Sequence, residues 1–422
     1  MIVVLTAFSF LSGFTYRDFG AGGGIHSAFE VTRSLPAKLA SAVSTEIEGS
    51  RAELPPVETY WNVFTYLDAN YYGKKPDPKD LTYAAAEGML ESLGDRYTRF
   101  LNPKEHEELQ QENRGDFEGI GAELDVKDSR VFIKKPIKNS PAIRAGLQPG
   151  DVILKVDDDL IQGLDITEVV KLIRGEKGSM VKLTIMREGV TEPFDVEIVR
   201  DVVPFTTVET KMEDETDKIG YIALRQFNEK SDQQFDEGLR ELESQGMRGL
   251  ILDLRGNPGG LLDVAIDIGS RFIQHGNVVI IQNKGGIRSA LPVERSKHNH
   301  KMHPLVVLID HGSASASEIV AGAIRDNKAG ILIGTDSFGK GLVQTIINLQ
   351  GGSAVSITTA KYLTPAGKDV AKDKIHPDIV VELSDEDIRN DNDIQLKRAV
   401  QVLKERLGAN QASSGTSAHV KS

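Results

Sequence analysis

The sequence predicts a multidomain α/β protein in which an N-terminal helical segment and a small β-rich domain precede a layered α/β core. Two observations support this fold class. The 422-residue chain exceeds the size at which a single hydrophobic core usually stops growing. The spacing of its apolar residues also changes twice, from helical to strand-like near residue 115, and to alternating strands and helices after residue 200.

The N-terminal segment, 1–49, begins with the apolar run MIVVLTAFSFLSGF. This run is shorter than the ~20 residues that a membrane-spanning helix needs. It is typical of the apolar part of a signal peptide or a shortened anchor, although no basic stretch precedes it, and a buried helix is the alternative. The next segment, 50–114, has apolar residues three and four positions apart, which predicts an N-terminal helical region.

Short alternating strands, separated by Gly and Pro turns, characterise segment 115–200. The expected strands are 131–135, 151–156, 181–187 and 194–199, with one helix at 165–173. Segment 201–385 alternates apolar strands with helices and predicts the α/β core. The expected strands are 219–225, 249–254, 278–282, 305–310 and 331–334, with helices at 231–245, 261–273 and 315–325. A C-terminal helix is expected at 386–407, and the polar tail 408–422 is expected to be disordered.

Composition excludes several classes of function. The net charge of −12 argues against a nucleic-acid-binding protein, which would need a basic face. The chain has no cysteine, so disulfides, thiol nucleophiles and thiolate metal sites are excluded. His298, His300 and His303 in KHNHKMH have a spacing that could bind metal, but no carboxylate or cysteine frames them. We therefore expect neither a metal nor a cofactor.

Two strings carry the chemistry of the chain, GSASASE at 312–318 and FGKGLVQ at 338–344. A serine is a weak nucleophile until a base takes its proton, and a lysine can be that base in Ser-Lys enzymes. The first string offers Ser313, Ser315 and Ser317, among which residue chemistry alone does not choose. Lys340 in the second string is too distant for one helix, so serine and lysine must converge in the fold.

The order of these and other motifs resembles the carboxyl-terminal processing peptidases, also called tail-specific proteases. The resemblance extends from about residue 54 to about residue 383. It includes GMLESLGDRYTRFL, GIGAEL, AGLQPGDVIL, LDLRGNPGGLL, GSASASEIVAGAI, FGKGLVQ and TTAKYLTPAGK.

The resemblance implies a role for each residue of the two strings. It makes Ser315 the nucleophile, Lys340 the general base and Gln344 a partner that fixes the lysine amine by a hydrogen bond. A lysine needs burial to be neutral near pH 7, which flanking glycines and Phe338 would allow. Glu318 is read as a first-turn carboxylate that binds helix N-terminal amides, not as a catalytic acid.

The Gly-rich turn in LDLRGNPGG is expected to supply the oxyanion hole, because backbone N–H groups there can bind a developing negative charge. By resemblance, the donors are the amide of Ala316 and that of either Gly259 or Gly260. The sequence does not choose between the two glycines.

Segment 115–200 resembles a PDZ domain, which binds a peptide C-terminus as an added strand and holds its carboxylate with backbone amides. The expected carboxylate-binding loop is Gly119, Ile120, Gly121 and Ala122. Arg174, at the end of the predicted helix, is a candidate relay between this domain and the core, although an ordinary surface ion pair also accounts for it.

Taken together, the resemblance implies a serine endopeptidase that recognises protein C-termini and cleaves through an acyl-enzyme. It also implies protein or peptide substrates, a homodimer through the N-terminal helices, an activating partner, and an exported location in the periplasm or at the outer face of the cytoplasmic membrane. Two alternatives remain. One is a non-catalytic PDZ scaffold with a decayed core, and the other is a Ser-His-Asp hydrolase that uses His311 with Asp253 or Asp310.

Overall fold

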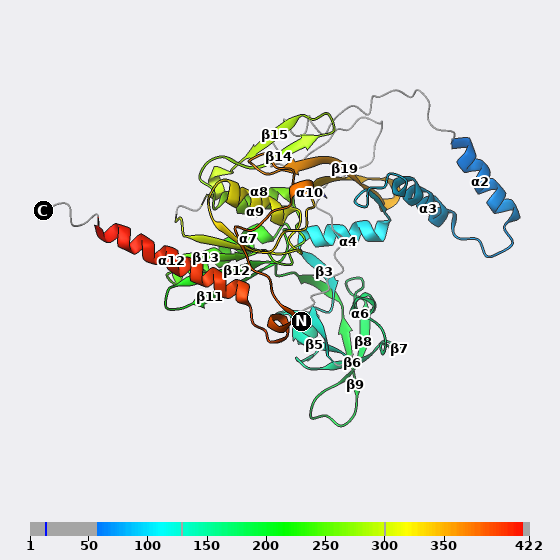
Figure 1. Cartoon of the computed structure of the whole chain (residues 1–422). Coiled ribbons are helices and arrows are strands. Elements are labelled where there is room, and N and C mark those ends of the chain that lie inside the picture. Colours follow the sequence, from blue (N-terminus) through cyan, green and yellow to red (C-terminus); the bar gives the residue numbers. More distant parts are fainter. Residues whose placement is uncertain (1–12, 15–56, 128–129, 299–300, 417–422) are drawn as a thin grey trace.

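The computed structural model describes residues 13–14, 57–127, 130–298 and 301–416 (Figure 1). The predicted signal or anchor segment therefore lies outside the described residues, apart from β1 (Gly13–Phe14), which pairs in parallel with β18. Across the described ranges, no helix is both long enough and apolar enough to cross a membrane.

The described part of the N-terminal region, from residue 57 to residue 114, contains three helices and one short strand. The helices are α2 (Val57–Asn70), α3 (Pro78–Glu91) and α4 (Pro103–Arg114). Between α3 and α4, β2 (Arg99–Leu101) pairs with β19 of the core. The sequence predicts only helices here, because three residues are too few to produce a recognisable strand pattern. This strand ties the N-terminal region to the second sheet of the core.

The middle domain is a β-sheet of the order β4-β5-β6-β8-β9, with β7 paired to β6. Its buried core is built from alternating strand residues such as Ile133, Leu183 and Ile185. The elements are β4 (Ala122–Lys127), β5 (Arg130–Pro136), α5 (Pro141–Arg144), β6 (Val152–Val156), β7 (Asp159–Leu160), α6 (Ile166–Ile173), β8 (Met180–Met186) and β9 (Phe194–Val199). At its junction with the core, β3 (Asp116–Gly119) pairs antiparallel with β10 (Asp201–Pro204).

The core is organised around a sheet of the order β11-β12-β13-β16-β17-β20, parallel except for its first pair. Its strands are β11 (Val208–Asp214), β12 (Ile219–Leu224), β13 (Gly249–Asp253), β16 (Leu305–Ile309), β17 (Ile331–Gly334) and β20 (Ile379–Val380). Helices cover both faces, so the central strands are continuous apolar runs instead of alternating ones. One face carries α7 (Ser231–Ser244), α8 (Leu262–Ser270) and α9 (Ala316–Asp326), and the other carries α12 (Ile394–Thr416).

A second sheet, of the order β1-β18-β19-β14-β15, packs on the outer side of α8 and α9 (Figure 1). Its strands are β14 (Asn277–Asn283), β15 (Arg288–Pro292), β18 (Leu342–Asn348) and β19 (Ala354–Leu363). Shorter elements are η1 (Arg295–Lys297), η2 (Gln350–Gly352), α10 (Val370–Asp373) and α11 (Asp385–Arg389).

The C-terminal helix differs from the sequence expectation. Instead of one helix at 386–407, the chain forms α11 and then α12, which continues to Thr416. Residues 408–416 are therefore helical, although their polar composition favours disorder. Ala399, Val402 and Leu403 are buried against the sheet and give the helix a tertiary anchor that propensity does not include.

Candidate active site

The turn between β16 and α9 distinguishes among its three serines. Ser313 donates its hydroxyl to the Leu254 carbonyl (2.8 Å), and Ser317 donates its own to the Asn257 carbonyl (2.9 Å). Both hydroxyls hold the turn in place. Ser315 lies immediately before α9 with φ of 54° and ψ of −114°, a conformation that only a sharp, well-supported turn imposes on a residue with a side chain. The geometry thus sets Ser315 apart from its two neighbours.

Glu318 joins the two strings of the sequence. Its Oε2 accepts hydrogen bonds from the backbone amides of Ser315 (2.8 Å) and Lys340 (2.9 Å). Its Oε1 accepts from the Ser337 hydroxyl (2.6 Å) and the Gly339 amide (2.7 Å). Burial raises the pKa of this carboxyl, and the four donors oppose that rise. Serine and lysine therefore converge on a single carboxylate oxygen, as their separation in the sequence requires.

Tyr362 on β19 completes this buried group. Its hydroxyl donates to Glu318 Oε2 (3.3 Å) and also contacts the Lys340 carbonyl oxygen. The side chain is fully buried, and burial together with the Glu318 charge raises its pKa well above the ordinary value. It was part of the TTAKYL motif, but no feature of the sequence indicated that its hydroxyl reaches this site.

Lys340 is buried, with only 1% of its surface exposed. Burial lowers the pKa of its amine to about 8, and the positive charges of Arg96 and Arg99 act in the same direction, whereas Glu318 opposes them. A neutral amine is consequently accessible near physiological pH.

Gln344 follows on β18 and is fully buried. Its Nε2 donates to Thr358 Oγ1 (3.3 Å). Its Oε1 is buried without a hydrogen bond to any described residue, which is costly unless a donor comes within reach. The amide thus offers an acceptor inside the same region of the core.

The Gly-rich turn after β13 packs directly on the serine turn. A Cβ on Gly259 would lie 2.7 Å from the Ser315 Cβ and 2.9 Å from the Ala316 nitrogen, so no larger residue fits. The Gly259 amide donates to Asn257 Oδ1 (2.9 Å), an internal use of that donor. A Cβ on Gly260 would lie 2.0 Å from the Phe227 carbonyl oxygen. Both glycines are needed for this close approach, and the Gly259 amide is already occupied.

Asn257 fixes this turn and was not singled out from the sequence. Its Nδ2 donates to the Leu224 carbonyl (2.7 Å), while its own carbonyl accepts from the Ala314 amide (3.0 Å) and the Ser317 hydroxyl. It therefore links three loops at the carboxyl ends of the parallel strands, where open α/β sheets carry their ligand sites.

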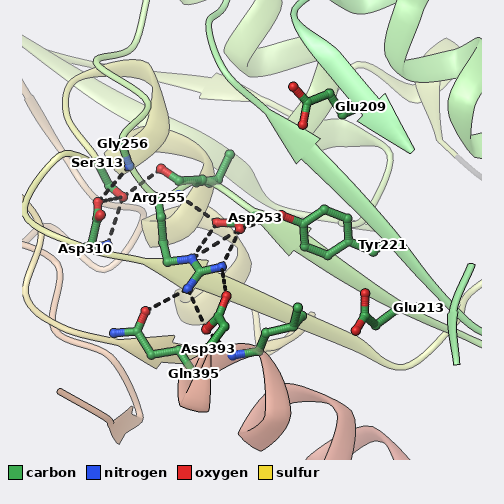
Figure 2. A network of polar contacts seen from close by, with 12 residues as sticks. Glu209, Glu213, Tyr221, Asp253, Arg255, Gly256, Asp310, Ser313, Asp393 and Gln395 are labelled. Atoms are coloured by element: carbon green, nitrogen blue, oxygen red, sulfur yellow. Dashed lines mark hydrogen bonds and ion pairs between the residues drawn. The ribbon is translucent and has the colours of Figure 1, made fainter. Parts of the chain in front are cut away.

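Arg255 anchors the same turn from its other side (Figure 2). Its guanidinium binds Asp253 (2.7 Å) and Asp393 (2.8 Å) and donates to Gln395 Oε1 (3.0 Å). The Tyr221 hydroxyl also donates to Asp253 (2.7 Å). These contacts connect the Gly-rich turn to the start of α12. Arg255 was not singled out from the sequence, although its place two residues after Asp253 in LDLRGNPGG was a usable signal.

Comparisons with known proteins agree with the motifs. Residues 218–381 match the family model of Peptidase family S41, and residues 119–198 match that of the PDZ domain. The chain is 39% identical over 323 residues to carboxy-terminal processing protease CtpA of Bacillus subtilis, covering 76% of this chain and 68% of that protein. It is 36% identical over 354 residues to the carboxyl-terminal-processing protease of Synechocystis sp., covering 82% of each.

The chain belongs to the carboxyl-terminal processing proteases of peptidase family S41. The predicted resemblance is thereby confirmed, as is the fold class of helical segment, PDZ domain and α/β peptidase core. A solved structure of a putative S41 protease from Bacteroides fragilis shares the fold, with a TM-score of 0.55 at 16% identity, covering 85% of this chain and 99% of that one.

His311 of this processing protease does not face the serine turn as a triad histidine would. It is exposed, and its Nδ1 is within hydrogen-bond distance of the Asp336 carbonyl (2.8 Å). Asp253 binds Arg255 and Tyr221, and Asp310 accepts from the Gly256 and Gly312 amides. Neither carboxylate is hydrogen-bonded to His311, which argues against the Ser-His-Asp alternative.

The PDZ domain presents the predicted loop between β3 and β4. The Ile120 and Gly121 carbonyls accept hydrogen bonds from Ala142 and Ile137, and Gly121 has a φ of 74°. A Cβ on Gly121 would lie 2.4 Å from that of Ser140, so glycine is required. Gly119 ends β3 and Ala122 begins β4.

Arg174 caps the end of α6, and its guanidinium lies over the Phe117 ring, 5.4 Å from the ring centroid. Phe117 belongs to β3, at the junction between the PDZ domain and the core. Arg174 therefore lies where a relay would have to lie, but its side chain is exposed.

The histidine-rich string is described only in part. His303 is 3.7 Å from Glu243, and His300 lies outside the described residues. Among the residues that the structure does describe, no three His, Cys, Asp or Glu side chains form a metal-binding group.

Proposed function

We propose that this processing protease cleaves peptide bonds by a Ser-Lys mechanism with Ser315 as nucleophile and Lys340 as general base. The observation that carries the proposal is the single Glu318 oxygen that accepts from the backbone amides of both residues. The lowered pKa of Lys340 supports it, because a base that works near neutral pH must release its proton there.

In this mechanism, the Ser315 hydroxyl oxygen attacks the substrate carbonyl carbon while Lys340 accepts the hydroxyl proton. The tetrahedral oxyanion receives hydrogen bonds from the Ala316 amide and a glycine amide. We favour Gly260 for the second donor, since the Gly259 amide is used by Asn257. The Lys340 ammonium returns the proton to the leaving amine, and an acyl-enzyme remains for water to hydrolyse by the reverse sequence.

Gln344 would hold the lysine amine toward the serine. Its Oε1 can accept a hydrogen bond from the amine and thereby direct the nitrogen lone pair away from itself. A fully buried amide whose oxygen has no described partner is suited to this task.

The test compares cleavage of an unstructured protein with an apolar C-terminus by the wild type, Ser315→Ala and Lys340→Ala. We expect both variants to lose at least ~10³-fold in kcat/KM, since nucleophile and base act as a unit. The matched control is Lys368→Ala, which removes an exposed lysine and should retain wild-type turnover. Retained activity in Lys340→Ala together with loss in His311→Ala would instead favour the histidine mechanism.

We also propose that the PDZ domain binds substrate C-termini at the Gly119–Ala122 loop. Within the described chain, the amides of Ile120 and Gly121 donate to no backbone carbonyl, which leaves them suited to a carboxylate. A peptide ending in a free carboxylate should bind more tightly than the same peptide with an amidated end. Equal affinity for the two peptides would reject this site.

Export to the periplasm or the outer face of the membrane, an activating partner, and a homodimer through the N-terminal helices also remain proposals. The dimer is supported by large apolar side chains exposed on α2 and near the end of α3, such as Trp61, Tyr66 and Met89. Analytical ultracentrifugation of the wild type and of Trp61→Glu tests this dimer. The same molar mass for both proteins would reject this interface.

A further inference from the structure

The amine of Lys340 is covered by a residue from outside the peptidase match. Its Nζ lies 5.1 Å from the centroid of the Tyr97 ring. Tyr97 belongs to the loop between α3 and β2, whereas the peptidase family match begins only at residue 218. The N-terminal region thus reaches the centre of the site.

This loop is fixed to the strand that also supports Gln344. The Asp95 carboxylate accepts from the Tyr97 amide (3.0 Å) and from the Thr98 hydroxyl (2.7 Å). Thr98 Oγ1 in turn accepts from the Thr358 amide (3.0 Å), and Thr358 Oγ1 is the acceptor for Gln344. The position of the Tyr97 ring is therefore defined by the same strand, β19, that positions the catalytic region.

Arg96 holds the outer part of this arrangement. Its guanidinium carbon lies 4.8 Å from the centroid of the Tyr97 ring and 5.5 Å from that of Phe338, two residues before Lys340. Its Nη2 also donates to the Tyr97 hydroxyl. Arg96 is exposed, so this residue bridges the two rings at the rim of the buried amine.

We propose that Tyr97, held by Arg96, is a positioning residue that excludes water from the Lys340 amine and so keeps this base neutral at working pH. The inference rests on the proposed Ser-Lys function. The N-terminal region would then contribute directly to catalysis, because the Tyr97 ring lies over the Lys340 amine only when β2 is paired with β19.

The Tyr97 ring has two opposing effects on the charge of the Lys340 amine. The face of an aromatic ring attracts an ammonium, which favours the charged lysine. Exclusion of water disfavours the charged form and can lower a lysine pKa by several units. Burial is the largest cause of the lowered pKa of Lys340, and the charged groups that act on it are Glu318 on α9, Arg96 in the loop before β2 and Arg99 on β2. Removal of the ring should therefore raise the pKa.

The experiment is the pH dependence of kcat/KM, which reports the pKa of the base in the free enzyme. In Tyr97→Ala, we expect the acid limb to move upward by about one unit or more, with kcat/KM ~10-fold lower at pH 7 and recovering toward the wild-type value near pH 10. Tyr97→Phe retains the ring, so the acid limb of its kcat/KM profile should lie at the same pH as in the wild type. Arg96→Gln removes a repelling charge and should shift the limb upward by a smaller amount.

The matched control is Tyr83→Ala on α3, whose ring packs on Phe100 of β2 at 4.9 Å but does not cover the amine. It loosens the same region and should not shift the limb. A Tyr97→Ala limb that coincides with the wild type, or lies below it, overturns the inference. If that variant does not fold, an unshifted limb in Arg96→Gln overturns it. Persistent activity in Lys340→Ala would instead reject the Ser-Lys function itself.

Discussion

Two groups of buried charge lie near the carboxyl ends of the parallel strands, and they are built differently. In the group around Arg255, one guanidinium faces the carboxylates of Asp253 and Asp393 (Figure 2). In the group around Lys340, the carboxylate of Glu318 points both oxygens at backbone and hydroxyl donors, while the amine faces the Tyr97 ring. Ion pairing raises the pKa of Arg255, whereas burial lowers that of Lys340. The first arrangement stabilises its charge and the second makes its charge easy to lose.

The largest contrast is expected in stability. Arg255→Met should lower the free energy of unfolding by about 3 kcal/mol, because Asp253 and Asp393 would be left without their counter-charge. Lys340→Met should cost less than about 1 kcal/mol or even stabilise, since a desolvated amine is replaced by an apolar chain of similar length. Urea denaturation of both variants at pH 7 measures the difference. Equal losses in the free energy of unfolding would show that the Arg255 and Lys340 groups contribute to stability in the same way.

Glu318→Gln tests how the lysine group is held together. A glutamine has one carbonyl oxygen where Glu318 offers two, so its NH₂ would face backbone donors now bonded to the carboxylate. We expect kcat to fall ~10²-fold through misplacement of Ser315 and Lys340.

Glu318→Gln should also change the pH dependence of kcat/KM. The Glu318 charge raises the pKa of Lys340, so its removal should move the acid limb of kcat/KM below its wild-type position near pH 8. A limb that does not move would mean that the Glu318 charge does not act on the Lys340 amine in the working enzyme.

Gln344→Leu should have a smaller effect. The substitution removes a buried oxygen that has no hydrogen bond within the described structure, so stability should be retained or rise slightly. If the amide orients the lysine amine, kcat should fall ~10-fold, the size expected for loss of one neutral hydrogen bond of about 1.4 kcal/mol. A rise in KM with unchanged kcat would instead assign Gln344 to substrate binding.

Much of the fold was predictable because local pattern and tertiary environment agree. The continuous apolar strands at 219–225, 249–254 and 305–310 correspond to β12, β13 and β16 within one residue at each end. Within the second sheet, β14 was predicted at 278–282. The other strands of this sheet were missed; β19, for example, has mostly half-buried residues on both faces and shows no clear alternation. β2 was missed because it is too short for any pattern.

The site was predictable only where its residues belong to short motifs of neighbouring residues. GSASASE and FGKGLVQ identified the region, and the family resemblance selected Ser315, whereas residue chemistry alone left Ser313, Ser315 and Ser317 open. The hydroxyls of Ser313 and Ser317 donate to carbonyls in the loop after β13, which no pattern in the sequence indicates. Tyr97 is far from Lys340 in the sequence, and their contact depends on the pairing of β2 with β19. No spacing within the sequence encodes such a contact.

The smallest predicted effect belongs to Arg174, which lies between the domains instead of in either charge group. Its contact with the Phe117 ring is exposed and worth about 0.5–1 kcal/mol, so Arg174→Ala should change kcat/KM on a short peptide by less than roughly fivefold. Glu112 on α4 offers a second readout. Burial raises the pKa of its carboxyl to about 7, and the charge of Arg174 opposes that rise. The variant should therefore raise this pKa further, measurable by NMR titration of the carboxyl. A loss of turnover well beyond fivefold, restored by a C-terminal peptide that binds the PDZ domain, would assign Arg174 a relay function that its exposed position alone does not predict.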